Sequence, residues 1–107
     1  MRWITAGFDW DAGNRKKCQK HGVSVEEIES LFTRPVILLP DILHSIHEER
    51  LRAIGKTDQG RHVFLVLTIR KRGRRSFIRP ISARYMHRQE VKQYEEDNPE
   101  LSHGPGS

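Results

Sequence analysis

The clearest pattern of apolar and polar positions lies in the middle of the chain. Residues 50–56 alternate between two faces with the period of a β-strand. One face carries Leu51, Ala53 and Gly55, and the other carries Arg50, Arg52 and Ile54. Residues 63–69 are apolar except for Thr68, which predicts a central strand covered on both faces. Residues 77–83 predict the next strand, in which Pro80 places either a bulge or an unpaired edge.

Glycine-containing connections at residues 58–60 and 71–74 join these three strands. Because such tight connections reverse the chain, they predict an antiparallel arrangement. Residues 36–39 form a further short apolar strand, and residues 4–10 predict a first strand near the N-terminus. A loop is expected over residues 40–49.

Three helices are predicted around these strands. The first follows a capping aspartate and occupies about residues 11–20. The second begins at Ser24, because Ser24 and Glu27 have the spacing of a capping box, and Pro35 ends it. The third spans residues 85–96. The predicted fold class is therefore α+β, with an antiparallel β-sheet packed with two N-terminal helices and one C-terminal helix.

The length of 107 residues indicates one domain, expected over residues 1–98 with a flexible tail over residues 99–107. No apolar run approaches the roughly 20 residues that span a bilayer, and the first residues lack the apolar core of a signal peptide. The single cysteine, Cys18, excludes an intrachain disulfide. We therefore expect a cytoplasmic protein that does not contact a membrane.

Positive charge is concentrated in the C-terminal half. The net charge is +5, and residues 70–92 hold nine lysines and arginines against one acid, Glu90. Such a local excess favours a polyanionic partner, since neutralised phosphates release counterions. The alternative interpretation is a solvated, solubilising surface.

If the polyanion is RNA, the same residues suggest chemistry. Cleavage needs a base for the ribose 2′-hydroxyl, positive charge on the phosphorane-like transition state and an acid for the leaving oxygen. Arginine binds phosphate in bidentate fashion, and histidine transfers protons near neutral pH, so no metal or other cofactor is required. Residues 79–88 place two arginines near one strand end, with His87 and a further arginine within a helical turn. The predicted catalytic residues are Arg84, His87, Arg50 and Arg79.

Further residues are predicted to bind RNA without taking part in the reaction. They are Lys20, His21, Arg52, Arg88 and Trp10. Each has a structural alternative: Lys20 and His21 stabilise a helix C-terminus, Trp10 packs in the core, and the arginines lie on a solvated face.

Two other kinds of site are disfavoured. His44 and His47, with neighbouring acids Asp41 and Glu48, have a spacing that can bind zinc, but the loop context argues against a preformed metal site. Nearby cations are expected to lower the pKa of the Cys18 thiol, yet no oxyanion motif accompanies it.

Two stretches of sequence carry a resemblance to a known family. The first runs from Phe8-Asp9-Trp10-Asp11 through Lys20-His21-Gly22-Val23-Ser24 to Phe32, and the second is Ile81-Ser82-Ala83-Arg84 followed by His87, Arg88 and Tyr94. Over residues 7–96 the chain is similar to the BrnT-type toxins, as a divergent branch of that family.

The resemblance implies a RelE-like fold and a metal-independent endoribonuclease that blocks translation. It also implies a BrnA-type ribbon-helix-helix antitoxin as partner, with promoter DNA bound only through the antitoxin complex. Two alternatives stay open: a noncatalytic nucleic-acid-binding module, and a scaffold that only binds an antitoxin.

Overall fold

The computed structural model describes residues 5–42 and 48–99. Its strands are β1 (Gly7–Phe8), β2 (Ile37–Pro40), β3 (Leu51–Lys56), β4 (His62–Arg72) and β5 (Arg75–Tyr85). Its helices are α1 (Ala12–Cys18), α2 (Val25–Ser30) and α3 (Arg88–Asp97), with a 3₁₀ turn at Leu31–Thr33 after α2. The α+β fold class with two N-terminal helices and one C-terminal helix is confirmed.

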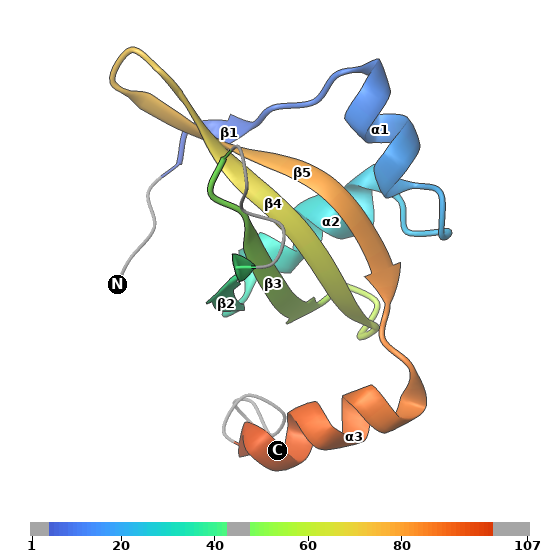
Figure 1. Cartoon of the computed structure of the whole chain (residues 1–107). Coiled ribbons are helices and arrows are strands. Elements are labelled where there is room, and N and C mark those ends of the chain that lie inside the picture. The colour runs from blue at the N-terminus through green and yellow to red at the C-terminus, as the bar shows by residue number, and fades with distance from the viewer. Residues whose placement is uncertain (1–4, 43–47, 100–107) are drawn as a thin grey trace.

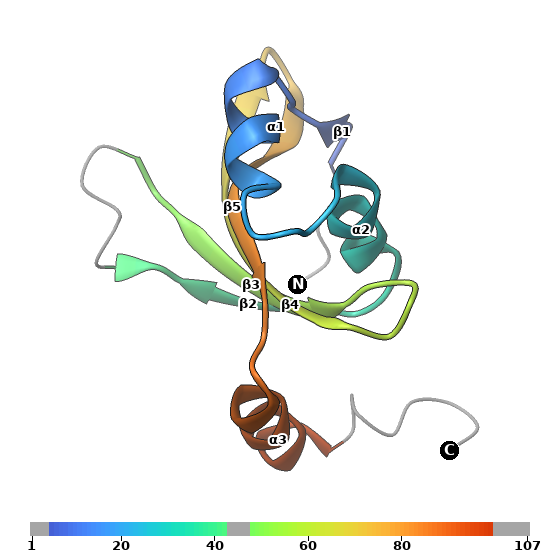
Figure 2. The same ribbon diagram turned by 90° about the vertical axis from the view of Figure 1, so that its right-hand side faces the viewer.

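The five strands form one sheet in the order β1-β5-β4-β3-β2 (Figure 1). All neighbouring pairs are antiparallel except β1 and β5, which are parallel. Helices α1 and α2 lie on one side of this sheet, and α3 lies below one end of it (Figure 2). The sheet therefore has one face covered by helices and a second, open face.

The core lies between α1, α2 and the covered face of the sheet. Alternate β4 residues Val63, Leu65 and Leu67 are fully buried there, against Ile28 and Leu31 of the α2 segment. The prediction that β4 is covered on both faces is wrong for most of the strand, because Phe64 and Val66 are only partly buried, although Thr68 is buried. The continuous apolar run hid an alternation, since the open face carries Phe64 and Val66 rather than polar residues.

The start of α2 forms as its sequence predicts. Ser24 Oγ accepts a hydrogen bond from Glu27 N at 3.0 Å, and Glu27 Oε1 accepts one from Ser24 N at 3.0 Å. Val23 and Ile28, on either side of this capping box, are both fully buried. The reciprocal bonds satisfy two N–H groups that a helix start leaves without partners.

Asparagine has a low helix propensity, but the side chain of Asn14 anchors the first helix. Asn14 forms a capping box with Asp11, and its Nδ2 donates to the carbonyl oxygens of Asp9 and Pro80, each at 2.9 Å. Asn14 is 7% exposed, so these bonds are shielded from water. They tie α1 to β5 at Pro80.

At Pro80 the β4–β5 ladder shifts register. Val66 pairs with Ser82 whereas Leu67 pairs with Pro80, which leaves Ile81 as an extra residue. Of the two predicted alternatives, a bulge or an unpaired edge, the structure has the bulge, and a residue without an N–H is tolerated at such a position.

The third helix begins later than the sequence pattern predicts. Tyr85 ends β5 and does not start α3. Its hydroxyl donates to the carboxylate of Glu27, at 2.7 Å from Oε1, and the Arg61 guanidinium lies 3.5 Å from its ring centroid. Pairing of Tyr85 with Val63 thus overrides the helical spacing of the segment.

In the described ranges, no helix is long and apolar enough to cross a membrane.

Candidate active site

The open face of the sheet gathers side chains from three neighbouring strands. Arg52 of β3 pairs with Val66 of β4, and Val66 pairs in turn with Ser82 of β5. Two residues along the same strands, Phe64 of β4 pairs with Arg84 of β5. Residues directly opposite one another in a ladder project from the same face. Strand pairing therefore brings together two arginines that are 32 positions apart in the sequence (84 less 52).

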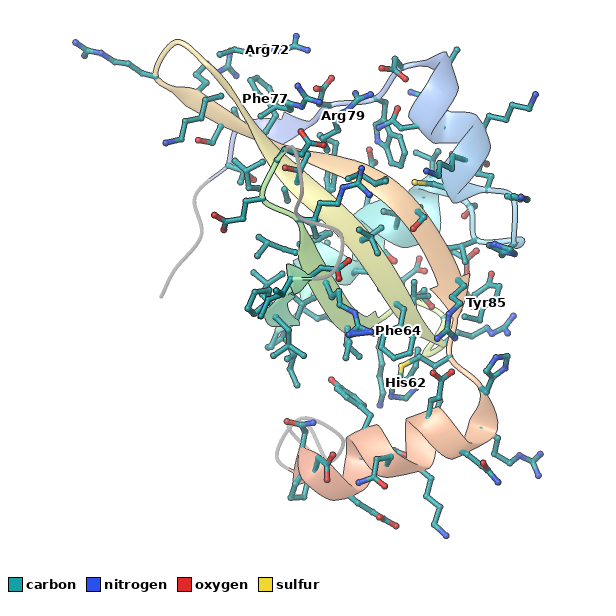
Figure 3. All side chains as sticks on the ribbon, in the orientation of Figure 1. His62, Phe64, Arg72, Phe77, Arg79 and Tyr85 are labelled. Carbon is teal, nitrogen blue, oxygen red and sulfur yellow. The ribbon has the colours of Figure 1, made fainter. Side chains whose placement is uncertain are left out.

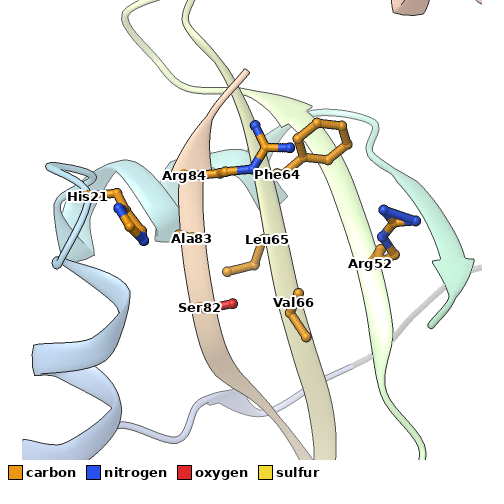
Figure 4. A pocket seen from close by; sticks show the side chains of 8 residues that line it. All are labelled: His21, Arg52, Phe64, Leu65, Val66, Ser82, Ala83 and Arg84. Atoms are coloured by element: carbon orange, nitrogen blue, oxygen red, sulfur yellow. The ribbon is translucent and has the colours of Figure 1, made fainter. Parts of the chain in front are cut away.

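A cavity of about 170 Å³ opens on this face (Figure 4). The loop after α1 supplies His21 across β5 from the arginines. The residues that line the cavity are His21, Arg52, Phe64, Leu65, Val66, Ser82, Ala83 and Arg84. Two guanidinium groups, a hydroxyl and an imidazole at an open cavity are suited to bind an anion.

Phe64 is flanked by both arginines. The guanidinium carbon of Arg84 lies 4.6 Å from its ring centroid, and that of Arg52 lies 6.0 Å away. Cation–π contacts at these distances stabilise the arginines above the ring, by about 0.5–1 kcal/mol each at exposed sites. The arrangement holds two positive charges beside an accessible aromatic surface.

Arg84 also forms a bidentate ion pair with Glu90 of α3. Its Nη1 and Nη2 donate to Glu90 Oε1 and Oε2, both at 2.9 Å. Hydrogen bonds from Arg84, and from the backbone N–H of His87, hold the pKa of Glu90 down at about 2. The same pair raises the pKa of Arg84, so both groups are charged at neutral pH. One edge of the Arg84 guanidinium is thus occupied by a carboxylate.

Of the predicted catalytic residues, only Arg84 lines the cavity. His87 is exposed at the N-cap of α3 and is linked to Arg84 through the Glu90 carboxylate. Arg79 donates to Asp11 at 2.8 Å and lies 3.5 Å from Asp9, which raises its pKa. Arg50 is partly buried one residue before β3.

The predicted RNA-binding residues do not all lie together. Arg52 and His21 line the cavity. Lys20 is exposed in the turn after α1, and Arg88 is exposed in the first turn of α3. Trp10 packs against the core and donates to Glu29 Oε2 at 3.0 Å. A role in RNA binding stays a prediction for all five.

Sequence reasoning missed three residues of this face. Phe64 and Ser82 line the cavity, and His62 lies two residues from Phe64 on β4, where its ring contacts Tyr94 of α3 with centroids 5.3 Å apart. Burial lowers the pKa of His62, and its Nε2 is buried with no hydrogen-bond partner among the described residues. A two-residue period applied to residues 62–66 is the signal that identifies His62 and Phe64.

The described residues do not support a cysteine nucleophile or a metal site. Burial raises the pKa of the Cys18 thiol to about 11, so the prediction of a lowered pKa is wrong. Desolvation outweighs the effect of nearby cations because the side chain is fully buried. Among residues 5–42 and 48–99, no three His, Cys, Asp or Glu side chains are grouped to hold a metal. His44 and His47 lie outside the described residues.

Comparison with known proteins agrees with the resemblance carried by the sequence motifs. No curated protein matches the chain. Residues 10–90 match the family model described as a ribonuclease toxin, BrnT, of a type II toxin–antitoxin system. This match covers the capping boxes of α1 and α2, the whole sheet from β2 to β5, and both members of the Arg84–Glu90 pair. The chain belongs to the BrnT family of ribonuclease toxins of type II toxin–antitoxin systems.

Proposed function

We propose that this protein is a metal-independent endoribonuclease and that the cavity on the open face is its active site. Family membership implies an RNA substrate and an antitoxin partner. The proposal adds the reaction, in which the ribose 2′-hydroxyl attacks the adjacent phosphate. Cleavage of RNA in the cytoplasm would then inhibit translation.

One observation carries the proposal: Phe64 lies between the guanidinium groups of Arg52 and Arg84 at the cavity. An unstacked base can stack on an aromatic side chain or on a guanidinium plane. The arginines can at the same time donate to the oxygens of the neighbouring phosphate. One compact cluster thus supplies contacts for a base and for the phosphate that follows it.

The reaction needs a proton acceptor and a proton donor. A base removes the 2′-hydroxyl proton, the new O–P bond forms, and the bond from phosphorus to the 5′-oxygen breaks as that oxygen receives a proton. The products are a 2′,3′-cyclic phosphate and a 5′-hydroxyl. We assign charge stabilisation of the transition state to Arg84 and Arg52, and proton transfer to His21 and His87.

Arg50 and Arg79 are assigned a supporting electrostatic role. Arg79 is held by Asp9 and Asp11, and these carboxylates offset much of its charge. Its field still adds to the positive potential of the open face. Substitution of Arg79 should therefore affect RNA binding less than substitution of Arg84.

Substitution of Arg84, one of the two arginines that line the cavity, tests the proposal. Purified wild type should shorten a labelled single-stranded RNA in the presence of EDTA and leave cyclic-phosphate ends. Arg84→Ala should lose about 10²–10³ in kcat, as expected when one transition-state donor is removed, while unfolding cooperatively. Lys92→Gln, an exposed cation of α3, is the matched control and should cleave normally. Cleavage by Arg84→Ala at the wild-type rate would contradict the assignment.

The Arg84–Glu90 pair favours a second candidate function. Because a carboxylate already occupies the guanidinium edge that a phosphate would use, the face would suit a noncatalytic module that binds RNA through its remaining cations. Such a module would lose RNA affinity as salt rises, yet leave every transcript intact.

The partner we propose is a BrnA-type ribbon-helix-helix antitoxin. The complex would bind promoter DNA through the antitoxin alone. Gel-shift experiments test this, since the toxin without its antitoxin should show no preference for the promoter sequence.

A further inference from the structure

The β4–β5 hairpin extends the open face beyond the rest of the sheet. β3 pairs with β4 only as far as Leu67, and β1 pairs with β5 only at Phe77 and Ile78. The hairpin therefore continues as a two-stranded ribbon that projects past the other strands (Figure 1). Gly73, with a φ of 64°, closes it.

This ribbon carries a second aromatic ring flanked by two arginines. The guanidinium carbons of Arg72 and Arg75 lie 5.8 and 5.4 Å from the ring centroid of Phe77. We call Arg72, Arg74, Arg75 and Phe77 the hairpin cluster. It repeats the arrangement of Arg52 and Arg84 around Phe64, and Figure 3 shows the two rings toward opposite ends of the sheet.

Both arginine-flanked rings project from the same face. Phe77 pairs with Arg70, and Arg75 pairs with Arg72. These β4 positions alternate in step with Phe64, so both clusters lie on the same side of the sheet. Between them Thr68 is buried, and its hydroxyl donates to the Glu49 carbonyl oxygen at 2.7 Å. Phe77 and Arg84 are seven residues apart on β5, which corresponds to roughly 20 Å at about 3.3 Å per residue. A polynucleotide several residues long can therefore contact both clusters.

The charge of the hairpin cluster is only partly neutralised within the protein. Residues 70–75 are all exposed, and five of the six are lysine or arginine. Arg72 lies 3.2 Å from Asp9. Arg74 and Arg75, by contrast, form no ion pair with any residue that the structure describes. Exposed guanidinium groups beside an accessible ring match the basic and aromatic surfaces that track single-stranded nucleic acid.

We propose that the hairpin cluster is a second RNA-binding subsite, which holds the backbone of single-stranded RNA and stacks one base on Phe77. It rests on the proposed ribonuclease function, because it binds the same strand at a distance from the cleaved phosphate. A dinucleotide fills the cavity alone, whereas a longer strand also reaches the hairpin cluster and gains affinity there.

Equilibrium binding to a 2′-O-methyl single-stranded RNA tests this subsite without cleavage. Arg74→Gln/Arg75→Gln removes two phosphate contacts. The plot of log association constant against log salt should therefore become less steep by between 1 and 2, at roughly 0.7 per contact. Phe77→Leu should weaken binding by about tenfold, because the stacking surface is lost. Neither variant should change the affinity for a dinucleotide.

Lys16→Gln/Lys92→Gln provides the matched control, since it removes two exposed cations from α1 and α3. An equal loss in this control would overturn the proposal by showing a nonspecific charge effect. Unchanged RNA binding with loss of antitoxin binding would also overturn it and assign the hairpin cluster to the antitoxin. The binding experiment does not require the protein to cleave RNA. If the protein failed to cleave RNA, the proposed activity would be rejected, but the binding result would still test the subsite.

Discussion

Glu90→Gln gives the sharpest test of how Arg84 is used. The substitution keeps the shape of the side chain and removes the charge that pairs with the guanidinium at 2.9 Å. A phosphate that enters the cavity competes with the Glu90 carboxylate for the same donors. We therefore expect the variant to bind RNA more tightly and to be less stable.

The size of both effects follows from the exposure of the pair. The Arg84 and Glu90 side chains are 43% and 30% exposed, so water screens their attraction despite the ideal bidentate geometry. An ion pair of this kind contributes about 1 kcal/mol at most. The melting temperature should fall by up to about 5 °C, and the dissociation constant for RNA should fall by up to about fivefold.

The stability difference should also depend on pH. The pKa of Glu90 is about 2 in the folded protein, below its ordinary value of 4.5. Stabilisation by the carboxylate is therefore complete above pH 4.5 and is lost as the pH falls toward 2. Denaturant unfolding of wild type and Glu90→Gln should converge across that range.

Binding to 2′-O-methyl RNA and thermal unfolding measure these expectations together. Glu96→Gln, an exposed acid on the same helix, controls for the general loss of negative charge. If Glu90→Gln binds RNA more weakly than both wild type and Glu96→Gln, the carboxylate orients Arg84 for RNA and does not compete with it. That result would refute the reasoning.

Three further predictions concern stability. Asn14→Ala removes both bonds to the carbonyl oxygens of Asp9 and Pro80 and should cost about 2–3 kcal/mol of unfolding free energy in urea. Gly55→Ala places a Cβ at 2.8 Å from Val36 Cγ1, so it should cost about 1–3 kcal/mol, with partial recovery on adding Val36→Ala. Tyr85→Phe deletes the hydroxyl bound to Glu27 and should lower the melting temperature through a loss of about 1–2 kcal/mol.

Each of these has a control or a contradicting outcome. Gln19→Ala removes an exposed amide at the opposite end of α1 and should unfold like wild type, whereas Asn14→Ala should not. A Gly55→Ala protein as stable as wild type would show that the Val36 side chain moves away without cost. Equal melting of Tyr85→Phe and wild type would show that Arg61 and water already satisfy the Glu27 carboxylate.

Local signals in the sequence were sufficient for several elements. The Ser24–Glu27 spacing located the start of α2, and Pro80 located the bulge. The alternation of residues 50–56 also divided β3 correctly into two faces, of which the Ala53 and Gly55 face is buried. These features depend on residues close together in the chain, whose chemistry restricts the local backbone.

The remaining features depend on partners that no spacing specifies. Tyr85 belongs to a strand because it pairs with Val63 across the sheet. Arg52 joins Arg84 at the cavity through β4 between them, and Phe64 looked like core in an apolar run. Sequence reasoning thus selected both cavity arginines, Arg84 as a predicted catalytic residue and Arg52 as a predicted RNA-binding residue, but not the ring of Phe64 that lies beside them.

The extra residue in β5 has a consequence for how this fold can change. With Ile81 present, Ser82 and Arg84 share a face with Phe77 and Arg79 although their numbers differ in parity. Deleting that one residue would turn the hairpin half of the strand over relative to the other half. Ile78 would then meet water and Phe77 would press into the interior. Single-residue length changes should therefore be rare at this position among functional relatives.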